Sequence, residues 1–263
     1  MTKVDICVVT HNSLNDIQKL LNILHSDNDG KSWELFIQDN GSTDGTKEWL
    51  MDNSVNMNIS YLSVGSNDGY AVACNNLAAM GSSPFIALCN ADIWLQTSDI
   101  HGMINSFHET GADILGPKQR DKQGRITHGG IFGTNTKPKF RGWKERDTKD
   151  ILYRDRVDAV TVSGAAYFIR RDTWDDLTYN SQYQNLYPGA SGAFLPTEFY
   201  YEETWCSYFA RHLGYRVMYD GSVSIGHQWH NSHEVGDYLD TRVVHESQAL
   251  FRKTCDAMGI EHD

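Results

Sequence analysis

The stretch that decides the fold is residues 35–42, LFIQDNGS, where a short apolar run ends in a polar cluster. Leu35–Gln38 has the length and composition of a buried β-strand, and Asp39 follows it directly. The same change from apolar to polar, with Asn or Asp in each polar cluster, predicts three further strands: Val4–Val9, Ile59–Val64 and Phe85–Cys89.

Helical patterns separate these strands. Leucine and isoleucine recur at helical spacing over residues 14–24, and Ser13 with Asp16 resembles a capping box at the start. Repeated strand–helix–strand units predict an α/β fold, with a parallel sheet and helices on both faces. Ligands of such sheets bind beyond the carboxyl ends of the strands, where the polar clusters lie. Further helices are expected at Thr46–Met51, at Tyr70–Ala79 with a stop at Gly81, and at Ser98–Glu109, before a strand at Ile114–Leu115.

The second half of the chain is less regular. Residues 118–156 lack helical periodicity and indicate long loops. Trp174–Phe199 is expected to be an aromatic-rich loop, whose rings could stack on a sugar or base but are more typical of packing. An amphipathic C-terminal helix is predicted between Tyr238 and Met258. The remaining elements are strands at Val160–Ile169, Arg216–Tyr219 and Val223–Ile225 and a helix at Glu202–His212.

The composition limits the classes of protein to which the chain could belong. The 263 residues are 40% hydrophobic and 22% charged, which is typical of a globular chain and not of a disordered one. No apolar run reaches the ~20 residues that span a bilayer. Residues 1–5 run directly into the first predicted strand, so we do not expect them to be a signal peptide. The five cysteines are odd in number and widely spaced, so we expect them to be reduced core residues of a cytoplasmic protein: Cys7, Cys74, Cys89, Cys206 and Cys255.

Charge is distributed unevenly. The net charge of −11 argues against general nucleic-acid binding. Residues 118–156, however, carry 12 lysines and arginines against 5 aspartates and glutamates. The simpler interpretation is a solvated, charge-rich excursion. The alternative is a basic lip that faces an anionic acceptor, such as a lipid-linked pyrophosphate or a nucleic acid.

Seven motifs follow one another in a set order. Together they resemble the family 2 glycosyltransferases of the GT-A fold, especially their rhamnosyltransferase-like branch, over roughly residues 4–232. No single motif is specific, whereas the ordered set is. The motifs are 8–13 (VVTHNS), 38–46 (QDNGSTDGT), 67–76 (NDGYAVACNN), 90–92 (NAD), 162–171 (VSGAAYFIRR), 201–203 (YEE) and 213–217 (LGYRV).

The resemblance implies a single Rossmann-like, mostly parallel sheet flanked by helices. Residues 1–232 would form the GT-A domain, with a nucleotide-sugar-binding half at 1–117 and an acceptor-binding half at 118–232. Residues 233–263 would form a C-terminal helical extension.

The implied activity is inverting transfer of a sugar from a UDP-, dTDP- or GDP-sugar to a hydroxyl of a glycan or lipid-linked glycan. By the resemblance, Asp92 and His227 hold Mn²⁺ or Mg²⁺, which stabilises the diphosphate leaving group. Glu203, or its neighbour Glu202, is the general base. His230 and His233 are rivals of His227 for the metal.

Further site residues carry over from the same motifs. Asp39 would bind the nucleobase, although alone it could cap the turn that follows it. Asn75 could equally be satisfied locally. The metal motif begins with Asn90 where relatives have Asp, and Trp205 replaces an acidic residue. The implied donor-binding residues are Thr10, Asn12, Asp39, Gly69, Asn75, Asn90 and Ala91, and the implied acceptor-binding residues are Gly164, Ala165 and Trp205.

Three other functions remain open. A metal-dependent nucleotidyltransferase would need a glycine-rich, basic loop after the first strand, and residues 10–13 (THNS) contain neither glycine nor lysine nor arginine. An inactive sugar-binding module would not need both Asp92 and Glu203. A glycosyltransferase acting on hydroxymethylated bases in DNA would use the basic stretch at 118–156. The sequence does not indicate the oligomeric state.

Overall fold

The computed structural model describes residues 3–26, 32–135, 137–228 and 241–262. These residues form a sheet of ten strands, in which eight follow the order β10-β12-β6-β11-β4-β1-β2-β3, while β5 pairs with β12 and β7 with β6. A separate hairpin consists of β8 and β9. The strands are β1 (Val4–Thr10), β2 (Trp33–Asn40), β3 (Ile59–Val64), β4 (Phe85–Asn90), β5 (Ile93–Trp94), β6 (Ile114–Arg120), β7 (Ile126–His128), β8 (Ile131–Gly133), β9 (Pro138–Phe140), β10 (Arg156–Asp158), β11 (Ala166–Arg170) and β12 (Val217–His227).

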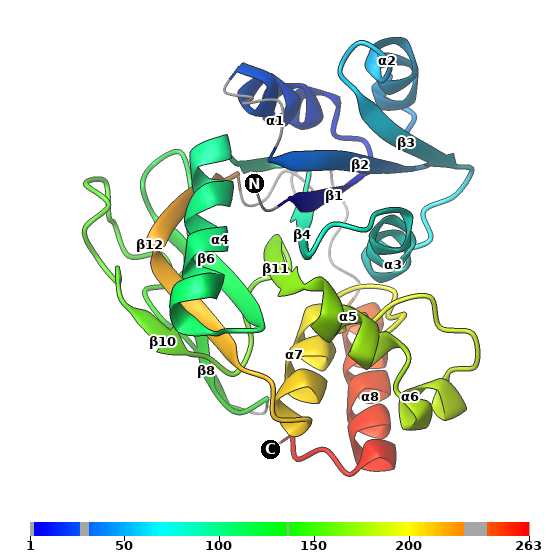
Figure 1. Cartoon of the computed structure of the whole chain (residues 1–263), viewed down its shortest axis with the longest axis vertical. Coiled ribbons are helices and arrows are strands. Elements are labelled where there is room, and N and C mark those ends of the chain that lie inside the picture. Colours follow the sequence, from blue (N-terminus) through cyan, green and yellow to red (C-terminus); the bar gives the residue numbers. More distant parts are fainter. Residues whose placement is uncertain (1–2, 27–31, 136, 229–240, 263) are drawn as a thin grey trace.

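Helices flank the sheet, and the α/β prediction is confirmed (Figure 1). The helices are α1 (Leu14–Ser26), α2 (Thr46–Asn53), α3 (Tyr70–Met80), α4 (Thr97–Thr110), α5 (Arg171–Thr178), α6 (Ser181–Leu186), α7 (Glu202–His212) and α8 (Thr241–Met258).

The strands of the first half pair in parallel, whereas the second half is mixed. β1 lies between β2 and β4, parallel to both, and β3 extends the sheet beside β2. This register places Thr10 beside Asp39 and Val9 beside Asn90. β11 runs antiparallel to β4 and β6, and β6 is parallel to β12. The carboxyl ends of β1, β2 and β4 therefore meet at one edge, as the polar clusters predicted.

Each face of the sheet has its own hydrophobic core, because successive residues of a strand point to opposite faces. On β1, Ile6 and Val8 pack in the core beneath α1, α2 and α4. Cys7 and Val9 pack on the other face in the core of α3 and α5–α8. Figure 1 shows α5, α6, α7 and α8 gathered at one end of the molecule. Two layers of helices thus hold the sheet between them.

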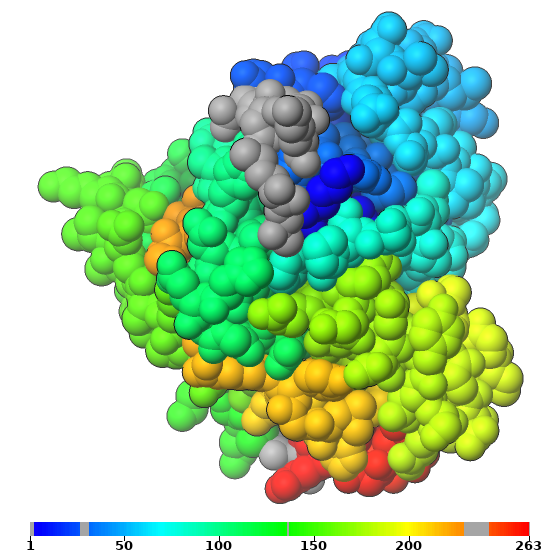
Figure 2. Space-filling model, viewed as in Figure 1, coloured from blue at the N-terminus to red at the C-terminus, as the bar shows by residue number. Residues whose placement is uncertain are grey.

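Residues 118–156 are more ordered than the expected long loops. β6 continues to Arg120, and β7, β8 and β9 follow within the segment. Lys118 is fully buried and forms ion pairs with Asp147 at 3.0 Å and with Asp150 at 2.5 Å. Figure 2 shows this part of the chain, in green, projecting from one side of the molecule. The interpretation of residues 118–156 as a solvated, charge-rich segment is therefore wrong for Lys118. The boundary expected at residue 117 falls inside β6.

The aromatic segment Trp174–Phe199 is also more regular than predicted. It contains most of α5 and all of α6. Tyr183 and Phe194 are fully buried, whereas Tyr179 is 71% exposed. The packing interpretation is therefore confirmed for Tyr183 and Phe194, and the prediction of a loop is wrong for the two helices.

Two strand predictions differ from the structure. The predicted strand Val160–Ile169 is regular only from Ala166, because residues 163–165 turn before β11 begins. The two strands expected at Arg216–Tyr219 and Val223–Ile225 are one strand, β12, whose register against β6 shifts between Asp220 and Ser224. The local composition predicted a break between two strands, but the chain continues as one strand through a β-bulge.

The predicted capping box of α1 is wrong. The Ser13 hydroxyl donates to the carbonyl of His11, and the Asp44 carboxylate accepts from the backbone N–H of Leu14 at 3.0 Å. Gly81 ends α3 as expected but has an extended backbone. Glycine is needed there for space, because a Cβ would lie 2.1 Å from Asp5 Oδ2.

The remaining predictions concern the cysteines and the C-terminal helix. All five cysteines are free and buried, as predicted. α8 begins at Thr241, so Tyr238 lies outside the described residues. Phe251 of α8 packs in the core against the ring of Tyr208 of α7. Within the described ranges, no helix combines the length and the apolar character that crossing a bilayer requires.

Candidate active site

The carboxyl ends of β1 and β2 are joined by a polar network. The Asp39 carboxylate is fully buried and accepts hydrogen bonds from the backbone N–H and the hydroxyl of Ser42. Asn12 accepts from the Thr43 N–H at 2.8 Å, and its own N–H donates to the Ser42 hydroxyl. Asp39 therefore does cap its own turn, and Thr10 beside it is buried. Asn12 is exposed at the edge where a donor would bind.

Asn75 is used within the protein. Its side-chain amide donates to the carbonyl of Phe194 at 2.9 Å and accepts from the Phe194 N–H at 3.1 Å. Asn75 is only 6% exposed. Both halves of the Asn75 amide therefore anchor the segment before α7, and the donor-binding role of Asn75 stays a prediction.

Gly69 lies at the start of α3 with φ of +88°, in the left-handed region that favours glycine. A Cβ there would lie 3.0 Å from the carbonyl oxygen of Glu198. Ala91 is buried, which leaves only its main chain for a donor contact. Asn90, its neighbour, donates its backbone N–H to the carbonyl of Ala165 at 3.0 Å.

Asp92 and His227 meet although they are far apart in the sequence. β5 pairs with β12 so that Ile93 lies opposite His227, and the Gln228 N–H donates to the Asp92 carbonyl at 2.9 Å. Asp92 Oδ1 then lies 3.6 Å from His227 Nε2. Burial lowers the pKa of His227, against the opposing effect of Asp92, which favours the neutral imidazole that binds metals. His230 and His233 lie outside the described residues.

The turn before β11 connects this pair to the glutamates. The Tyr70 hydroxyl donates to the Gly164 carbonyl at 2.6 Å, which fixes the turn. A Cβ on Gly164 would lie 3.5 Å from Cγ of Glu203. Gly164 and Ala165 thus lie between Glu203 and Asn90, the first residue of the metal motif.

The two glutamates at the start of α7 differ in environment. Glu202 is 6% exposed, and its Oε2 accepts from the Thr197 hydroxyl at 3.2 Å. Burial, and then the charge of Glu203, raise the pKa of Glu202. Burial also raises the pKa of Glu203. Glu203 Oε2 is buried and has no hydrogen-bond partner among the described residues. The pair therefore favours a protonated Glu202 beside a Glu203 that ionises first and faces a cavity.

Strained backbone precedes these glutamates. Tyr200 and Tyr201 have φ of +66° and +70°, which is uncommon for residues other than glycine. The Tyr201 hydroxyl accepts from the Gln248 amide at 2.7 Å, and its ring packs against Phe251. α8 therefore supports the turn that presents Glu203.

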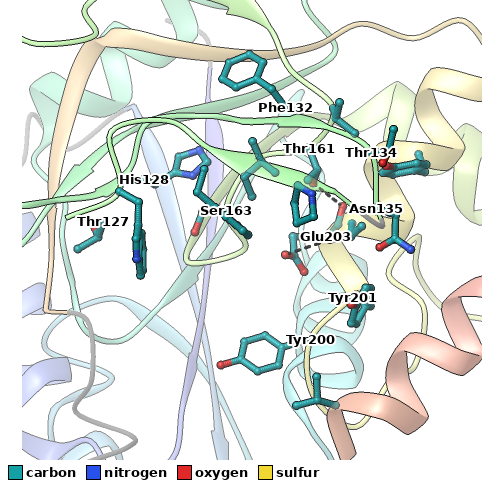
Figure 3. A pocket seen from close by; sticks show the side chains of 18 of the residues that line it. Thr127, His128, Phe132, Thr134, Asn135, Thr161, Ser163, Tyr200, Tyr201 and Glu203 are labelled. Atoms are coloured by element: carbon teal, nitrogen blue, oxygen red, sulfur yellow. Dashed lines mark hydrogen bonds between the residues drawn. The ribbon is translucent and has the colours of Figure 1, made fainter. Parts of the chain in front are cut away.

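A cavity of about 370 Å³ opens beside Glu203 and His227. Figure 3 shows Glu203 between Ser163 and the two tyrosines, Tyr200 and Tyr201. Asp39 and Asp92 do not line this cavity; Asp92 is linked to it through His227. The edge at Thr10 and Asp39 therefore lies apart from this cavity.

Sequence reasoning missed several residues that line this cavity. They lack a motif, because they reach it from the irregular second half of the chain, where neither periodicity nor spacing indicates which side chains point inward. The residues are Thr127, His128, Thr161 and Tyr200.

The prediction that Trp205 contacts the acceptor is wrong. Its side chain is fully buried, and its ring stacks on Tyr183 and Phe209 with centroids 5.7 and 5.1 Å apart. Trp205 instead holds α7 against α6. It thereby helps to position Glu202 and Glu203, which lie about one turn before it in α7.

The fold and the site together define a class of enzyme. Residues 5–177 match the model of glycosyl transferase family 2. The chain belongs to this family and has the GT-A fold. No curated protein matches the chain.

Solved structures agree on the fold. Residues 1–349 of S. aureus TarS in complex with UDP-GlcNAc have a TM-score of 0.66 and 16% identity, covering 96% of this chain and 66% of that one. GalNAc-T7 with UDP, GalNAc and Mn²⁺ has a TM-score of 0.69 and 14% identity, covering all of this chain and 55% of that one. The chain therefore spans two thirds or less of these proteins, and the similarity establishes the fold alone.

Proposed function

We propose that the protein is an inverting, metal-dependent glycosyltransferase that moves a sugar from a nucleoside-diphosphate sugar to a hydroxyl of a glycan or lipid-linked glycan. One observation carries the proposal: His227 lies 3.6 Å from Asp92 and lines the same cavity as Glu203. One member of the candidate metal pair and the candidate base thus line the same cavity.

Asp92 and His227 suit a divalent cation. Ligand atoms about 2.1 Å from one ion lie roughly 3–3.6 Å from each other, which the 3.6 Å separation matches. Within the described part of the chain, no three His, Cys, Asp or Glu side chains cluster around one point. Two protein ligands are typical of Mg²⁺ sites that also use substrate phosphates. When bound, the cation would neutralise charge on the diphosphate leaving group.

The chain's own residues supply the base and the support for the donor. The Glu203 carboxylate takes the proton of the acceptor hydroxyl as that oxygen bonds to the anomeric carbon. The bond from this carbon to the diphosphate oxygen breaks, and its electron pair leaves with the nucleoside diphosphate. A single displacement of this kind inverts the configuration. We place the nucleoside at the edge formed by Thr10, Asn12 and Asp39.

The similar proteins support the choice of donor and metal. The TarS structure contains UDP-GlcNAc, and the GalNAc-T7 structure contains UDP and Mn²⁺. A UDP-sugar with Mn²⁺ is therefore the first donor and metal to test, before dTDP- and GDP-sugars and Mg²⁺.

Glu203→Gln and Glu202→Gln test the assignment of the base as a matched pair. Donors that raise the melting temperature of the wild type identify the nucleotide, and release of nucleoside diphosphate measures turnover. We expect Glu203→Gln to lose about 10²–10⁴-fold in turnover and to bind the donor normally. Glu202→Gln should retain most activity. A Glu203→Gln enzyme as active as the wild type would refute the proposed base.

A further inference from the structure

The cavity beside Glu203 has largely aromatic walls. Its volume of about 370 Å³ lies within the ~300–1,000 Å³ of small-molecule sites. Of its aromatic residues, Phe140 is 55% exposed, Tyr200 38% and Trp143 37%, so the mouth is apolar as well. The aromatic walls consist of Phe132, Phe140, Trp143, Tyr200, Tyr201 and Tyr208.

Buried polar atoms without partners converge on this cavity. Glu203 Oε2, His227 Nδ1 and His128 Nε2 are each shielded from solvent and find no hydrogen-bond partner in the described ranges. All three residues line the cavity. Buried polar groups in folded proteins are nearly always paired, so several orphans around one cavity indicate a ligand that supplies the partners.

Of these three residues, His128 is the one to which the proposed reaction assigns no role. It ends β7, is 5% exposed, and its ring lies edge-on to that of Tyr219 with centroids 5.9 Å apart. Burial, followed by repulsion from His227 and Arg141, lowers the pKa of His128 to about 3. The imidazole is therefore neutral at physiological pH and can either donate or accept one hydrogen bond at Nε2.

No described side chain that lines the cavity carries a fixed positive charge. Among the described residues that line it, none is lysine or arginine. Arg141 does not line the cavity: its guanidinium stacks on Phe132 and Tyr219, Nη1 binds Asp155 at 2.9 Å and Nε donates to the Gly129 carbonyl at 2.7 Å, which leaves only Nη2 without a partner among the described residues. The cation proposed at Asp92 and His227 would already be balanced by the Asp92 carboxylate and the donor diphosphate. A phosphate or carboxylate in the cavity would therefore face Glu203 at a high cost of desolvation.

We propose that this cavity is the acceptor subsite of the proposed reaction and selects an uncharged, ring-bearing alcohol, with His128 as a specificity-determining residue. The ring packs on the aromatic walls, and the reacting hydroxyl donates to Glu203 Oε2. A second polar group of the acceptor pairs with His128 Nε2. The assignment rests on the proposed function and goes beyond it by excluding phosphate groups as acceptors.

Binding of two probes without donor tests this proposal. The probes are phenyl β-D-glucopyranoside, a neutral ring alcohol, and the same compound phosphorylated at its 6-hydroxyl. We expect saturation-transfer NMR and calorimetry to show the neutral probe bound to the wild type and the phosphorylated probe at least 10-fold weaker. Equal or tighter binding of the phosphorylated probe, or no binding of the neutral one, overturns the proposal.

Variants locate the binding. His128→Phe should weaken the neutral probe at least 10-fold and leave UDP affinity in Mn²⁺ unchanged, while His128→Gln, which can still donate and accept, should retain part of it. His108→Phe is the matched control, since His108 is exposed on α4 and does not line the cavity. Wild-type probe affinity in His128→Phe overturns the role of His128. Loss of transfer in Glu203→Gln tests the reaction separately, so the two proposals fail independently.

Discussion

Asp92 Oδ1 lies 3.6 Å from His227 Nε2, although 134 residues lie between them in the sequence. The pairing of β5 with β12 creates this proximity. The distance is too long for a hydrogen bond and suits two ligands of one cation. The two side chains therefore give the clearest test of metal dependence.

We predict that Asp92→Ala weakens Mn²⁺-dependent binding of a nucleoside-diphosphate donor by at least 10-fold, because the cation loses its carboxylate. His227→Ala should act in the same direction but more mildly. Calorimetry of UDP with Mn²⁺ and with EDTA measures both effects, and His108→Ala serves as an exposed control. Wild-type affinity of Asp92→Ala in Mn²⁺ would contradict the ligand assignment.

A second prediction concerns pH and Glu202. Its pKa in the folded state is raised above the ordinary 4.5 by burial and by Glu203, so the folded protein holds a proton that the unfolded chain releases. This contribution is complete below pH 4.5 and is lost as pH rises through the folded pKa. Glu202→Gln should therefore flatten the decline of unfolding free energy above pH 4.5, as measured by urea titrations across pH. An unchanged slope would show that Glu202 is not held protonated.

Asn75 allows the structural role to be separated from donor binding. Asn75→Ala leaves the Phe194 N–H unpaired, which costs about 1–3 kcal/mol, whereas the Phe194 carbonyl keeps a 3.4 Å bond from the Tyr183 hydroxyl. Urea unfolding should show this loss, whereas the folded variant should bind UDP normally. Asn76→Ala is the control, because Asn76 is only partly buried and makes one 3.2 Å bond to Gln38. A large loss of UDP affinity without loss of stability would instead support the donor-binding role.

The buried ion pair of the basic segment gives a fourth prediction. Lys118→Met should destabilise the protein by about 3–5 kcal/mol, because it leaves the Asp147 carboxylate buried beside it without a counter-charge. Replacing both residues, as Lys118→Met with Asp147→Leu, should recover part of that loss. Exposed Lys122→Met should cost less than about 0.5 kcal/mol. Denaturant midpoints compare the three, and equal midpoints for Lys118→Met and Lys122→Met would refute the role of the pair.

Much of the first half was predictable from local patterns. The strand Ile59–Val64 and the helix Glu202–His212 have the predicted bounds. The other elements before residue 115 differ mainly at their ends, except β5, which was not predicted. Alternation of apolar residues and polar strand ends are properties of short windows, so they are visible without tertiary contacts. The same local patterns gave a wrong prediction for β12, which was expected to be two strands. A strand can continue through a polar stretch by forming a bulge, and local composition does not show this.

The roles of individual site residues were less predictable. Asn75 and Trp205 occupy motif positions, yet one is paired with Phe194 and the other is buried beside Tyr183. Burial depends on what the rest of the chain brings alongside, which a motif does not encode. His128 had no motif at all, and only the assembled cavity reveals it.

The sequence alone determined most strands and helices before residue 115 and the polar ends of β1, β2 and β4, because these follow from residues near one another in the chain. Tertiary structure decided that His227 meets Asp92, that Glu203 rather than Glu202 faces the cavity, and that His128 joins them. Those contacts join segments far apart in the sequence, so their geometry exists only after the sheet has paired and the two cores have packed.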